Sequence, residues 1–222
     1  MHPVAPNSEF KIQNSKLILA LSVAAALACG KPDPARINYR LPPPNPTQTF
    51  HLGAQVKDLV LTDISETTSS IEDYRGRVVV LEFWSCRCPF VARSEQARQR
   101  LIAQYAPRGV VYLAIDSNRD EYPEEIRRYL ADQRSSCTVI ADYTSAAARR
   151  FNATRTPQAF VINRDGIVCF GGDPFSPRQW AKPQPERADW LEAALEAVFA
   201  GRPPDPASPS PSGSRIRPYR GL

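Results

Sequence analysis

Two cysteines, Cys86 and Cys88, stand directly after a largely apolar run at 78–84 (VVVLEFW). Pro89 follows Cys88, and proline is common at the first position of a helix. A thiol at such a position is favoured as a thiolate, because unpaired N–H groups and the helix dipole there stabilise an anion. The thiolate is the nucleophilic form of cysteine. The sequence therefore predicts thiol redox chemistry with Cys88 as the nucleophile.

Neighbouring side chains complete this candidate site. A helix dipole contributes only about 0.3–1 kcal/mol to an anion at its N-terminus. We therefore expect Arg87 and Arg93 to add to the stabilisation of the Cys88 thiolate. Cys86 is either the thiol that resolves an intermediate on Cys88 or a bystander at the strand end. A disulfide between the two cysteines would be strained, and strained disulfides are more oxidising.

The composition excludes several classes of function. The histidines are His2 and His51, and neither is near the cysteines in the sequence. Catalysis by a cysteine–histidine or serine–histidine pair and zinc sites built on histidine therefore lack their imidazole. The net charge of +5 is carried mainly by the two ends of the chain, which leaves no basic domain for nucleic acid. We expect no cofactor and no bound metal.

The N-terminal residues have the pattern of a secretory leader. Lys11 and Lys16 precede a largely apolar stretch at 17–28, which ends in small residues. At about 1.5 Å per residue, this stretch is too short to span a bilayer core of about 30 Å. The segment resembles a bacterial lipoprotein leader, so we expect 1–28 to be removed and Cys29 to be lipidated. Plain cleavage without lipidation is the alternative. Either outcome predicts an extracytoplasmic domain, on the periplasmic side of a bacterial cell envelope.

Proline-rich segments divide the rest of the chain. Residues 30–49 are expected to form an extended linker, and residues 201–222 a disordered tail rich in proline, serine and arginine. Between them, 50–200 shows alternating strand and helix patterns, which predict an α/β domain with a mixed sheet. The expected strands are 59–62, 78–84, 110–115, 138–141, 159–163 and 167–170, and the expected helices are 89–105, 123–133, 145–151 and 188–199.

Several motifs of this domain match one known family in order and spacing. They are Gly53, the strand at 59–63, the segments 74–84 and 114–118, Cys88-Pro89, Thr156-Pro157 and Asp165-Gly166. The chain resembles the thioredoxin-like redoxins, which include thiol-disulfide oxidoreductases, alkyl hydroperoxide reductases and thiol-specific antioxidant proteins. This resemblance implies a thioredoxin-like fold, in which a mixed central sheet is flanked by helices in a single domain.

The resemblance also implies roles for residues around the nucleophile. Pro157 is expected to be cis and to face Cys88. The backbone of Thr156 is expected to pair with an extended substrate, in the manner of an added strand. Trp84 and Pro89 are expected to contribute to the same substrate surface.

Glu82 lies inside the apolar run, where a carboxylate must be paired or protonated. Thioredoxins carry a buried acid at the aligned position, so the resemblance implies a catalytic proton acceptor. The alternative is a glutamate that faces solvent at a strand edge or pairs with an arginine. Cys137 and Cys169 are expected to pack in the core. The family's sheet order places their strands toward opposite edges, so no bond between them is expected.

The site departs from the family pattern in two places. Val91 stands where the second cysteine of a Cys-x-x-Cys pair belongs. The segment from Ser85 to Pro89 also resembles the peroxiredoxin motif Thr/Ser-x-x-Cys-Pro. However, Leu81 replaces the proline that this motif carries four residues before its first position. The identity of the resolving thiol therefore stays open.

Three functions follow from these patterns. The first is a lipid-anchored, extracytoplasmic thiol-disulfide oxidoreductase that acts on protein disulfides or dithiols and uses an external thiol as reductant. The second is a peroxiredoxin-like peroxidase that reduces small hydroperoxides through a sulfenic acid on Cys88. The third is a non-enzymatic binding module in which Cys86 and Cys88 hold Cu(I).

Overall fold

The computed structural model describes residues 49–219 of the chain. The predicted leader at 1–28, the predicted lipidation site Cys29 and all but the last residue of the predicted linker lie outside the described residues. Within 49–219, no helix is both long and apolar enough to cross a membrane.

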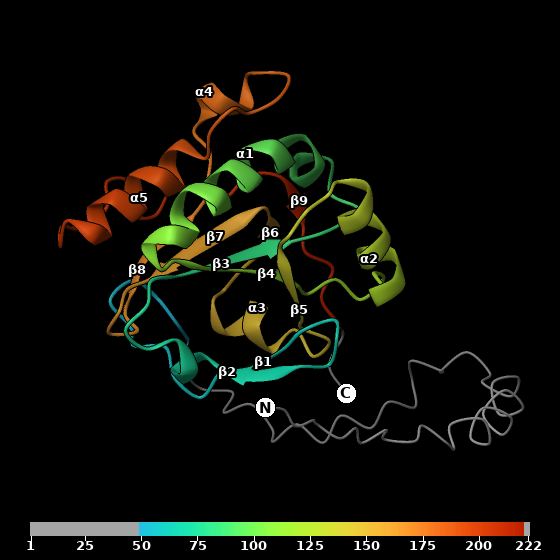
Figure 1. The fold of residues 1–222 in the computed structure, drawn as a ribbon, viewed down its shortest axis with the longest axis horizontal. Coiled ribbons are helices and arrows are strands. Elements are labelled where there is room, and N and C mark those ends of the chain that lie inside the picture. Colours follow the sequence, from blue (N-terminus) through green and yellow to red (C-terminus); the bar gives the residue numbers. More distant parts are fainter. Residues whose placement is uncertain (1–48, 220–222) are drawn as a thin grey trace, which may run out of the picture. The chain divides into compact units, whose positions relative to one another are not determined.

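The domain is built on a five-stranded mixed sheet with the strand order β5-β4-β3-β7-β8 (Figure 1). β3 is the middle strand, parallel to β4 and antiparallel to β7. The outer pairings are β4 with β5, which is parallel, and β7 with β8, which is antiparallel. The strands are β3 (Val79–Trp84), β4 (Val111–Asp116), β5 (Thr138–Ala141), β7 (Gln158–Ile162) and β8 (Val168–Gly172).

Helices cover both faces of β3, and all six of its residues are buried. Side chains alternate between the faces of a strand. Val80 packs in one core cluster with residues of α1 and α5, whereas Leu81 and Phe83 pack in another with residues of α3. This double cover explains why the strand reads as a continuous apolar run. The helices are α1 (Pro89–Tyr105), α3 (Ala146–Arg150) and α5 (Asp189–Phe199).

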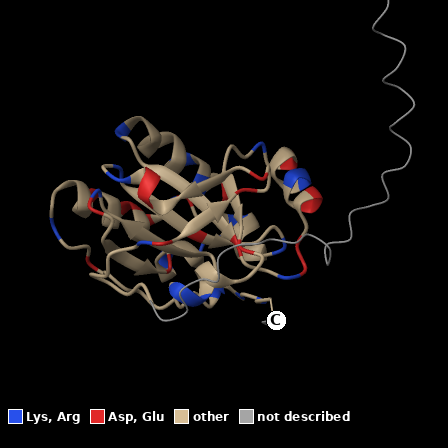
Figure 2. Cartoon of the chain, turned by 90° about the horizontal axis from the view of Figure 1, so that it is seen from below, with Lys and Arg blue, Asp and Glu red and all other residues tan. Residues whose placement is uncertain are grey.

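The remaining elements lie around this core. α2 (Pro123–Asp132) contributes Ile126 to a third cluster, which also contains Trp84 and Cys88. The shorter elements are β1 (Val60–Thr62), β2 (Thr68–Ser70), β6 (Arg155–Thr156), β9 (Ser214–Arg215), α4 (Pro177–Trp180) and the 3-10 helices η2 (Ile71–Tyr74) and η3 (Ala106–Arg108). Basic and acidic residues are interspersed along these elements (Figure 2).

The predicted fold class is confirmed. The sheet is mixed, helices flank it, and each expected strand and helix is present with its ends within a few residues of the expected positions. The expected final hairpin is the antiparallel pair β7 and β8. Its connection contains Gly166, whose φ of +80° is readily adopted only by glycine.

The C-terminal tail departs from the prediction. A disordered segment was expected at 201–222, and this is wrong for the described part, 201–219. β9 in this tail pairs antiparallel with β6. Figure 1 shows the tail, in red, running back across the domain toward β6.

Backbone hydrogen bonds explain why the tail is ordered. The N–H of Gly171, in the edge strand β8, donates to the carbonyl of Ala207 at 3.0 Å. The N–H of Asp173 donates to the carbonyl of Pro209 at 3.3 Å. A segment poor in apolar residues cannot form a core of its own, but it can satisfy the unpaired backbone groups of an existing sheet edge.

Candidate active site

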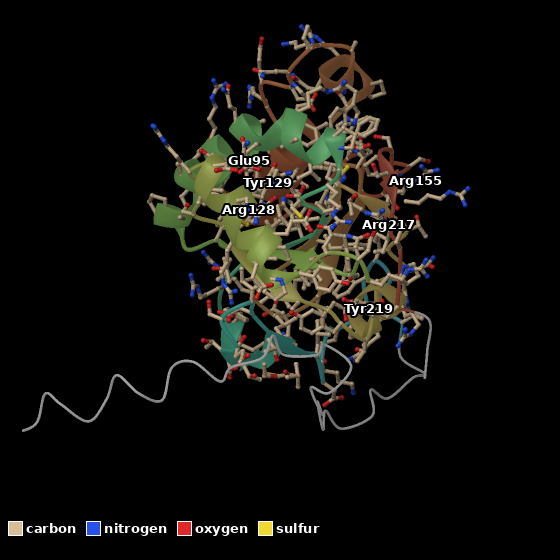
Figure 3. All side chains as sticks on the ribbon, turned by 90° about the vertical axis from the view of Figure 1, so that its right-hand side faces the viewer. Glu95, Arg128, Tyr129, Arg155, Arg217 and Tyr219 are labelled. Atoms are coloured by element: carbon tan, nitrogen blue, oxygen red, sulfur yellow. The ribbon has the colours of Figure 1, made fainter. Side chains whose placement is uncertain are left out.

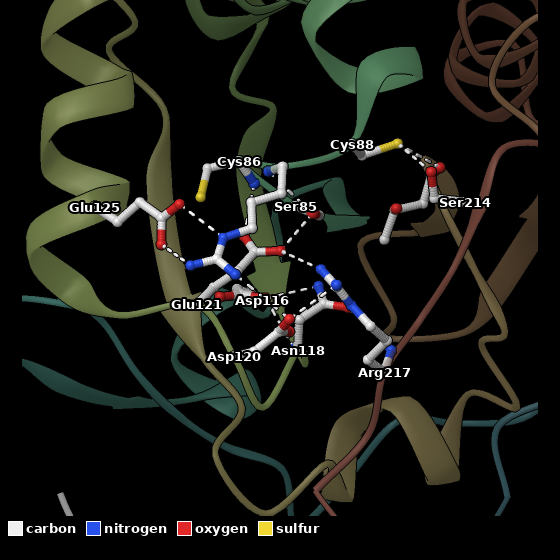
Figure 4. A network of polar contacts seen from close by, with 12 residues as sticks. Ser85, Cys86, Cys88, Asp116, Asn118, Asp120, Glu121, Glu125, Ser214 and Arg217 are labelled. Carbon is white, nitrogen blue, oxygen red and sulfur yellow. Dashed lines mark hydrogen bonds and ion pairs between the residues drawn. The ribbon is translucent and has the colours of Figure 1, made fainter.

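Cys88 is the N-cap residue of α1, directly after the loop that leaves β3. It is only 2 % exposed. The Sγ lies 3.1 Å from the carbonyl oxygen of Thr156 and 3.2 Å from the Oγ of Ser214 (Figure 4). Both oxygens can accept the thiol proton, but only the serine hydroxyl could donate a hydrogen bond to a thiolate. The sulfur therefore sits at a helix N-terminus with a possible hydroxyl donor beside it.

The Thr156–Pro157 peptide bond is cis, as the sequence resemblance implied. Strand register explains its position near the cysteine. Gln158, the first residue of β7, is paired with Phe83, near the end of β3. The segment just before β7 is therefore brought to the end of β3 from which the Cys88 loop leaves. Two motifs far apart in the sequence thus meet at one place.

Cys86 is held by an acidic side chain rather than by Cys88. Its backbone N–H donates to Glu121 at 2.7 Å, and the hydroxyl of Ser85 donates to the same carboxylate. Burial raises the pKa of the Cys86 thiol far above its ordinary value, and the hydrogen bond and charge of Glu121 raise it further. Figure 4 shows the sulfur atoms of Cys86 and Cys88 pointing away from each other. This arrangement disfavours the Cys86 thiolate, and the Cys86 sulfur faces away from the predicted reactive thiol.

Glu121 belongs to a group of acidic residues at the carboxyl end of β4 (Figure 4). Asp116, the last residue of β4, is 5 % exposed. Burial raises the pKa of the Asp116 carboxyl, and the charge of Glu121 adds to this effect. A cation from the tail reaches the group, since Nη1 of Arg217 lies 2.8 Å from Oδ2 of Asp120. The tail therefore contributes a countercharge beside the cysteine loop.

Glu82 is paired with a buried arginine. Arg98 donates to the two carboxylate oxygens at 2.8 and 3.0 Å, and the hydroxyl of Tyr112 also donates to Glu82. Burial alone lowers the pKa of Arg98, but the charges of Glu82 and Glu95 reverse this and raise it. The geometry matches the alternative that the sequence left open, a glutamate neutralised by an arginine. Its predicted part in proton transfer stays a prediction.

The sequence and the fold of this domain are similar to those of known proteins. A family model described as AhpC/TSA family matches residues 52–170, more than half of the chain. The chain belongs to the AhpC/TSA family. It is an oxidoreductase, and its fold is thioredoxin-like.

The relatives of this AhpC/TSA chain include named oxidoreductases. Thiol-disulfide oxidoreductase ResA of Bacillus thuringiensis subsp. konkukian is 22 % identical over 121 residues, which is 54 % of this chain and 69 % of the relative. A solved structure of an uncharacterized conserved protein from Geobacillus kaustophilus has a TM-score of 0.68 and 27 % identity, and the match covers 78 % of this chain and 95 % of that one. A putative thiol:disulfide interchange protein DsbE from Chlorobium tepidum has a TM-score of 0.55 at 22 % identity, over 68 % and 99 % of the two chains, and shows the fold alone.

The two arginines beside Cys88 in the AhpC/TSA domain have other partners. Arg87 donates to both carboxylate oxygens of Glu125, at 2.7 and 2.6 Å, and this contact lowers the pKa of Glu125. The guanidinium of Arg93 lies 5.0 Å from the ring centre of Trp180. The prediction that these arginines stabilise the Cys88 thiolate is not supported by these contacts, because both guanidiniums are held elsewhere.

The predicted substrate surface is only partly formed as expected. Pro89 is exposed at the start of α1. Trp84, however, is 1 % exposed, and its ring packs edge-on against Tyr129 at 5.3 Å. The prediction that Trp84 lines the substrate surface is therefore wrong for this structure, because α2 covers the side chain. The Trp84 side chain instead lies in the same apolar cluster as Cys88, where α2 separates it from solvent.

Cys137 is buried in the same apolar cluster as Cys88, whereas Cys169 lies in the edge strand β8. Cys137 precedes β5 and Cys169 lies in β8, at opposite edges of the sheet, and both are free thiols. Burial raises the pKa of Cys137 to about 12 and also raises that of Cys169. Core packing remains their predicted role in this AhpC/TSA chain.

Sequence reasoning missed Glu121 and Ser214. For Glu121 a signal was available, because the pair Asp120-Glu121 follows the strand next to the cysteine strand, and carboxyl ends of parallel strands share an edge. Ser214 carries no such signal. It reaches Cys88 only because the tail pairs with β6.

Proposed function

We propose that this chain is an extracytoplasmic thiol-disulfide oxidoreductase with Cys88 as its nucleophile. The observation that carries the proposal is the contact of the Cys88 thiol with the carbonyl of Thr156, at 3.1 Å, next to cis-Pro157. This contact places the sulfur beside a backbone edge that can pair with an extended polypeptide. The similarity to proteins named thiol-disulfide oxidoreductase ResA supports the same chemistry.

The reaction is a two-electron exchange between sulfur atoms. After the Cys88 thiol loses its proton to water, its sulfur attacks one sulfur of a client disulfide. A bond forms between Cys88 and the client as the client's own S–S bond breaks, and the leaving sulfur takes up a proton. An external dithiol then attacks the Cys88 sulfur and releases the client as a dithiol. A second exchange releases the oxidised external disulfide and restores the Cys88 thiol.

The resolving thiol in this scheme is external rather than Cys86. Burial and Glu121 disfavour the Cys86 thiolate, and the two sulfur atoms point apart (Figure 4). Resolution by Cys86 would require both its deprotonation and a rearrangement of the loop at 85–88.

The proposed location rests on the sequence. The leader pattern at 1–28 and Cys29 favour export and a lipid anchor on the outer side of a bacterial membrane. Mass spectrometry of the mature N-terminus tests this part separately. A lipidated Cys29 is the expected result, and an intact leader or an unmodified Cys29 would contradict the anchor.

The peroxidase alternative has weaker support. The hydroxyl of Ser85, the first residue of the peroxiredoxin-like motif, donates to Glu121 and accepts the N–H of Arg87 at 3.2 Å. Both of these hydrogen bonds of the Ser85 hydroxyl are made to groups other than Cys88. The hydroxyl is therefore not positioned to orient a peroxide at the Cys88 sulfur.

Insulin reduction and peroxide consumption by the same preparations test the proposal. We expect the chain to reduce insulin with a dithiol as reductant, Cys88→Ser to abolish this turnover, and Cys86→Ser to retain most of it. Insulin turnover that persists in Cys88→Ser would contradict the proposal. Peroxide consumption that depends on Cys88, without insulin turnover, would replace it by the peroxidase.

A further inference from the structure

The backbone edge beside Cys88 is occupied by the chain's own C-terminal segment. β9 pairs antiparallel with β6, and Ser214 stands opposite Thr156. The hydroxyl of Ser214 lies 3.2 Å from the sulfur of Cys88. A strand edge offers one set of N–H and C=O groups. An external polypeptide therefore cannot pair with β6 while β9 is in place.

Hydrogen bonds hold the segment on both sides of β9. Before it, the N–H of Ser212 donates to Asp173 at 3.0 Å. After it, the N–H of Arg217 donates to Oδ1 of Asn118 at 3.0 Å. Figure 3 shows Arg217 and Tyr219 along the same side of the domain. The segment is thus held on both sides of β9 as well as by the contact between Ser214 and Cys88.

The contact over the site is close and depends on small residues. Gly213 has a φ of +91°, and a Cβ at this position would lie 2.2 Å from the carbonyl oxygen of Thr156. Only glycine fits this approach without displacement. Residues 212–216 are half-buried or exposed, and polar contacts hold them together with one apolar side chain, Ile216, which packs against the cluster that contains Leu81 and Phe83. Segments held in this way open locally at a small fraction of the global unfolding free energy.

We propose that residues 213–217 form an intramolecular cap, which occupies the place of a client strand and shields Cys88 until the cap leaves β6. The part that concerns client polypeptides rests on the proposed function. The shielding of the thiol does not, because it concerns only the access of any reagent to Cys88.

One point variant and one truncated variant remove the cap in different ways. Gly213→Ala introduces a Cβ that overlaps the Thr156 carbonyl. A stop codon after Ser212 deletes the cap but keeps the hydrogen bonds of Ala207 and Pro209 with the edge of β8. Gly109→Ala is the matched control, because Gly109 has a similar φ of +85° and no heavy atom within 4 Å of the added Cβ.

The primary measurement is the rate at which iodoacetamide alkylates Cys88 at neutral pH. Trypsin cleaves after Arg87, so the adducts of Cys86 and Cys88 are found on different peptides. We expect both cap variants to react about tenfold faster or more at Cys88, and Gly109→Ala to react as the wild type. Equal circular dichroism and thermal unfolding midpoints for the three variants would show that global unfolding is not the cause.

Failure of the cap is distinguishable from failure of the proposed function. Cys88 alkylation that is no faster in either variant overturns the cap, even if the wild type reduces insulin. Faster alkylation without any insulin turnover supports the cap as a shield and contradicts the oxidoreductase. Faster alkylation together with faster insulin reduction supports both.

Discussion

The thiol of Cys88 and the carbonyl of Thr156 lie 3.1 Å apart, although they belong to segments far apart in the sequence. The antiparallel pairing of β3 with β7 brings these segments together. One contact thus joins a thiol at a helix N-terminus to a backbone strand that can recognise extended chains. The proposed chemistry and the proposed cap both depend on this contact.

Alkylation of Cys86 should be slow at neutral pH and should accelerate steadily in base. Burial raises the pKa of this thiol, so its thiolate fraction stays small and grows about tenfold with each pH unit below that pKa. Between about pH 7 and about pH 10 we expect the rate to rise roughly a thousandfold without levelling off. Iodoacetamide rates on the tryptic peptide that contains Cys86 measure this. A plateau within the range would show that Cys86 ionises normally.

The substitution Glu121→Gln should make Cys86 more reactive. It removes a negative charge and a carboxylate acceptor, both of which raise the pKa of the thiol. We expect alkylation of Cys86 at a fixed alkaline pH to increase by about tenfold, the effect of one pKa unit. Glu124→Gln, an exposed change on α2, serves as the control. Equal rates in wild type and Glu121→Gln would show that Glu121 does not suppress the reactivity of Cys86.

Arg98→Met should strongly destabilise the fold. Glu82 and Arg98 are both buried and joined at 2.8 Å, so removing the cation leaves an unpaired charge in the core. Breaking such a pair costs about 3–5 kcal/mol. Urea unfolding measures the loss, with Lys182→Met as the control because its partner Glu186 is exposed. A similarly small loss of unfolding free energy for both substitutions would contradict a buried ion pair between Glu82 and Arg98.

A cysteine in place of Ser214 should cross-link the tail to the site. The Oγ of Ser214 lies 3.2 Å from the Cys88 sulfur, so Ser214→Cys brings a second thiol within bonding reach after small movements. In a Cys86→Ser background, mild oxidation should give an intramolecular disulfide that joins the peptides containing positions 88 and 214. Mass spectrometry under non-reducing conditions detects it. Recovery of both thiols unpaired would show that β9 does not rest beside Cys88 in solution.

The sequence predicted the site best where a residue with a chemical role stands at the end of an apolar strand. Cys88 and Pro157 each follow or precede an apolar run, and a sheet with the expected order brings the ends of those runs together. Trp84 was misplaced because an apolar run that is buried on both faces gives no sign of which residues remain accessible. Likewise, α1 contains several arginines, and only the packed structure identifies Arg98 as the partner of Glu82.

The tail could not be predicted from its composition. A low apolar content shows that a segment cannot form its own core, but it does not report pairing with an existing edge. Neither Gly213 nor Ser214 has a property that distinguishes it from other small residues in a proline-rich segment. Their importance comes entirely from the position of β6.

The central claim is that Cys88 is the nucleophile, and trapping its first covalent product tests this most directly. A peptide that carries an activated disulfide is mixed with the full-length protein, the reaction is stopped with acid, and the modified tryptic peptide is identified. The account predicts a mixed disulfide on the peptide that begins at Cys88, formed faster when the cap is removed. A mixed disulfide that forms first on Cys86, or on Cys137 or Cys169, would contradict it.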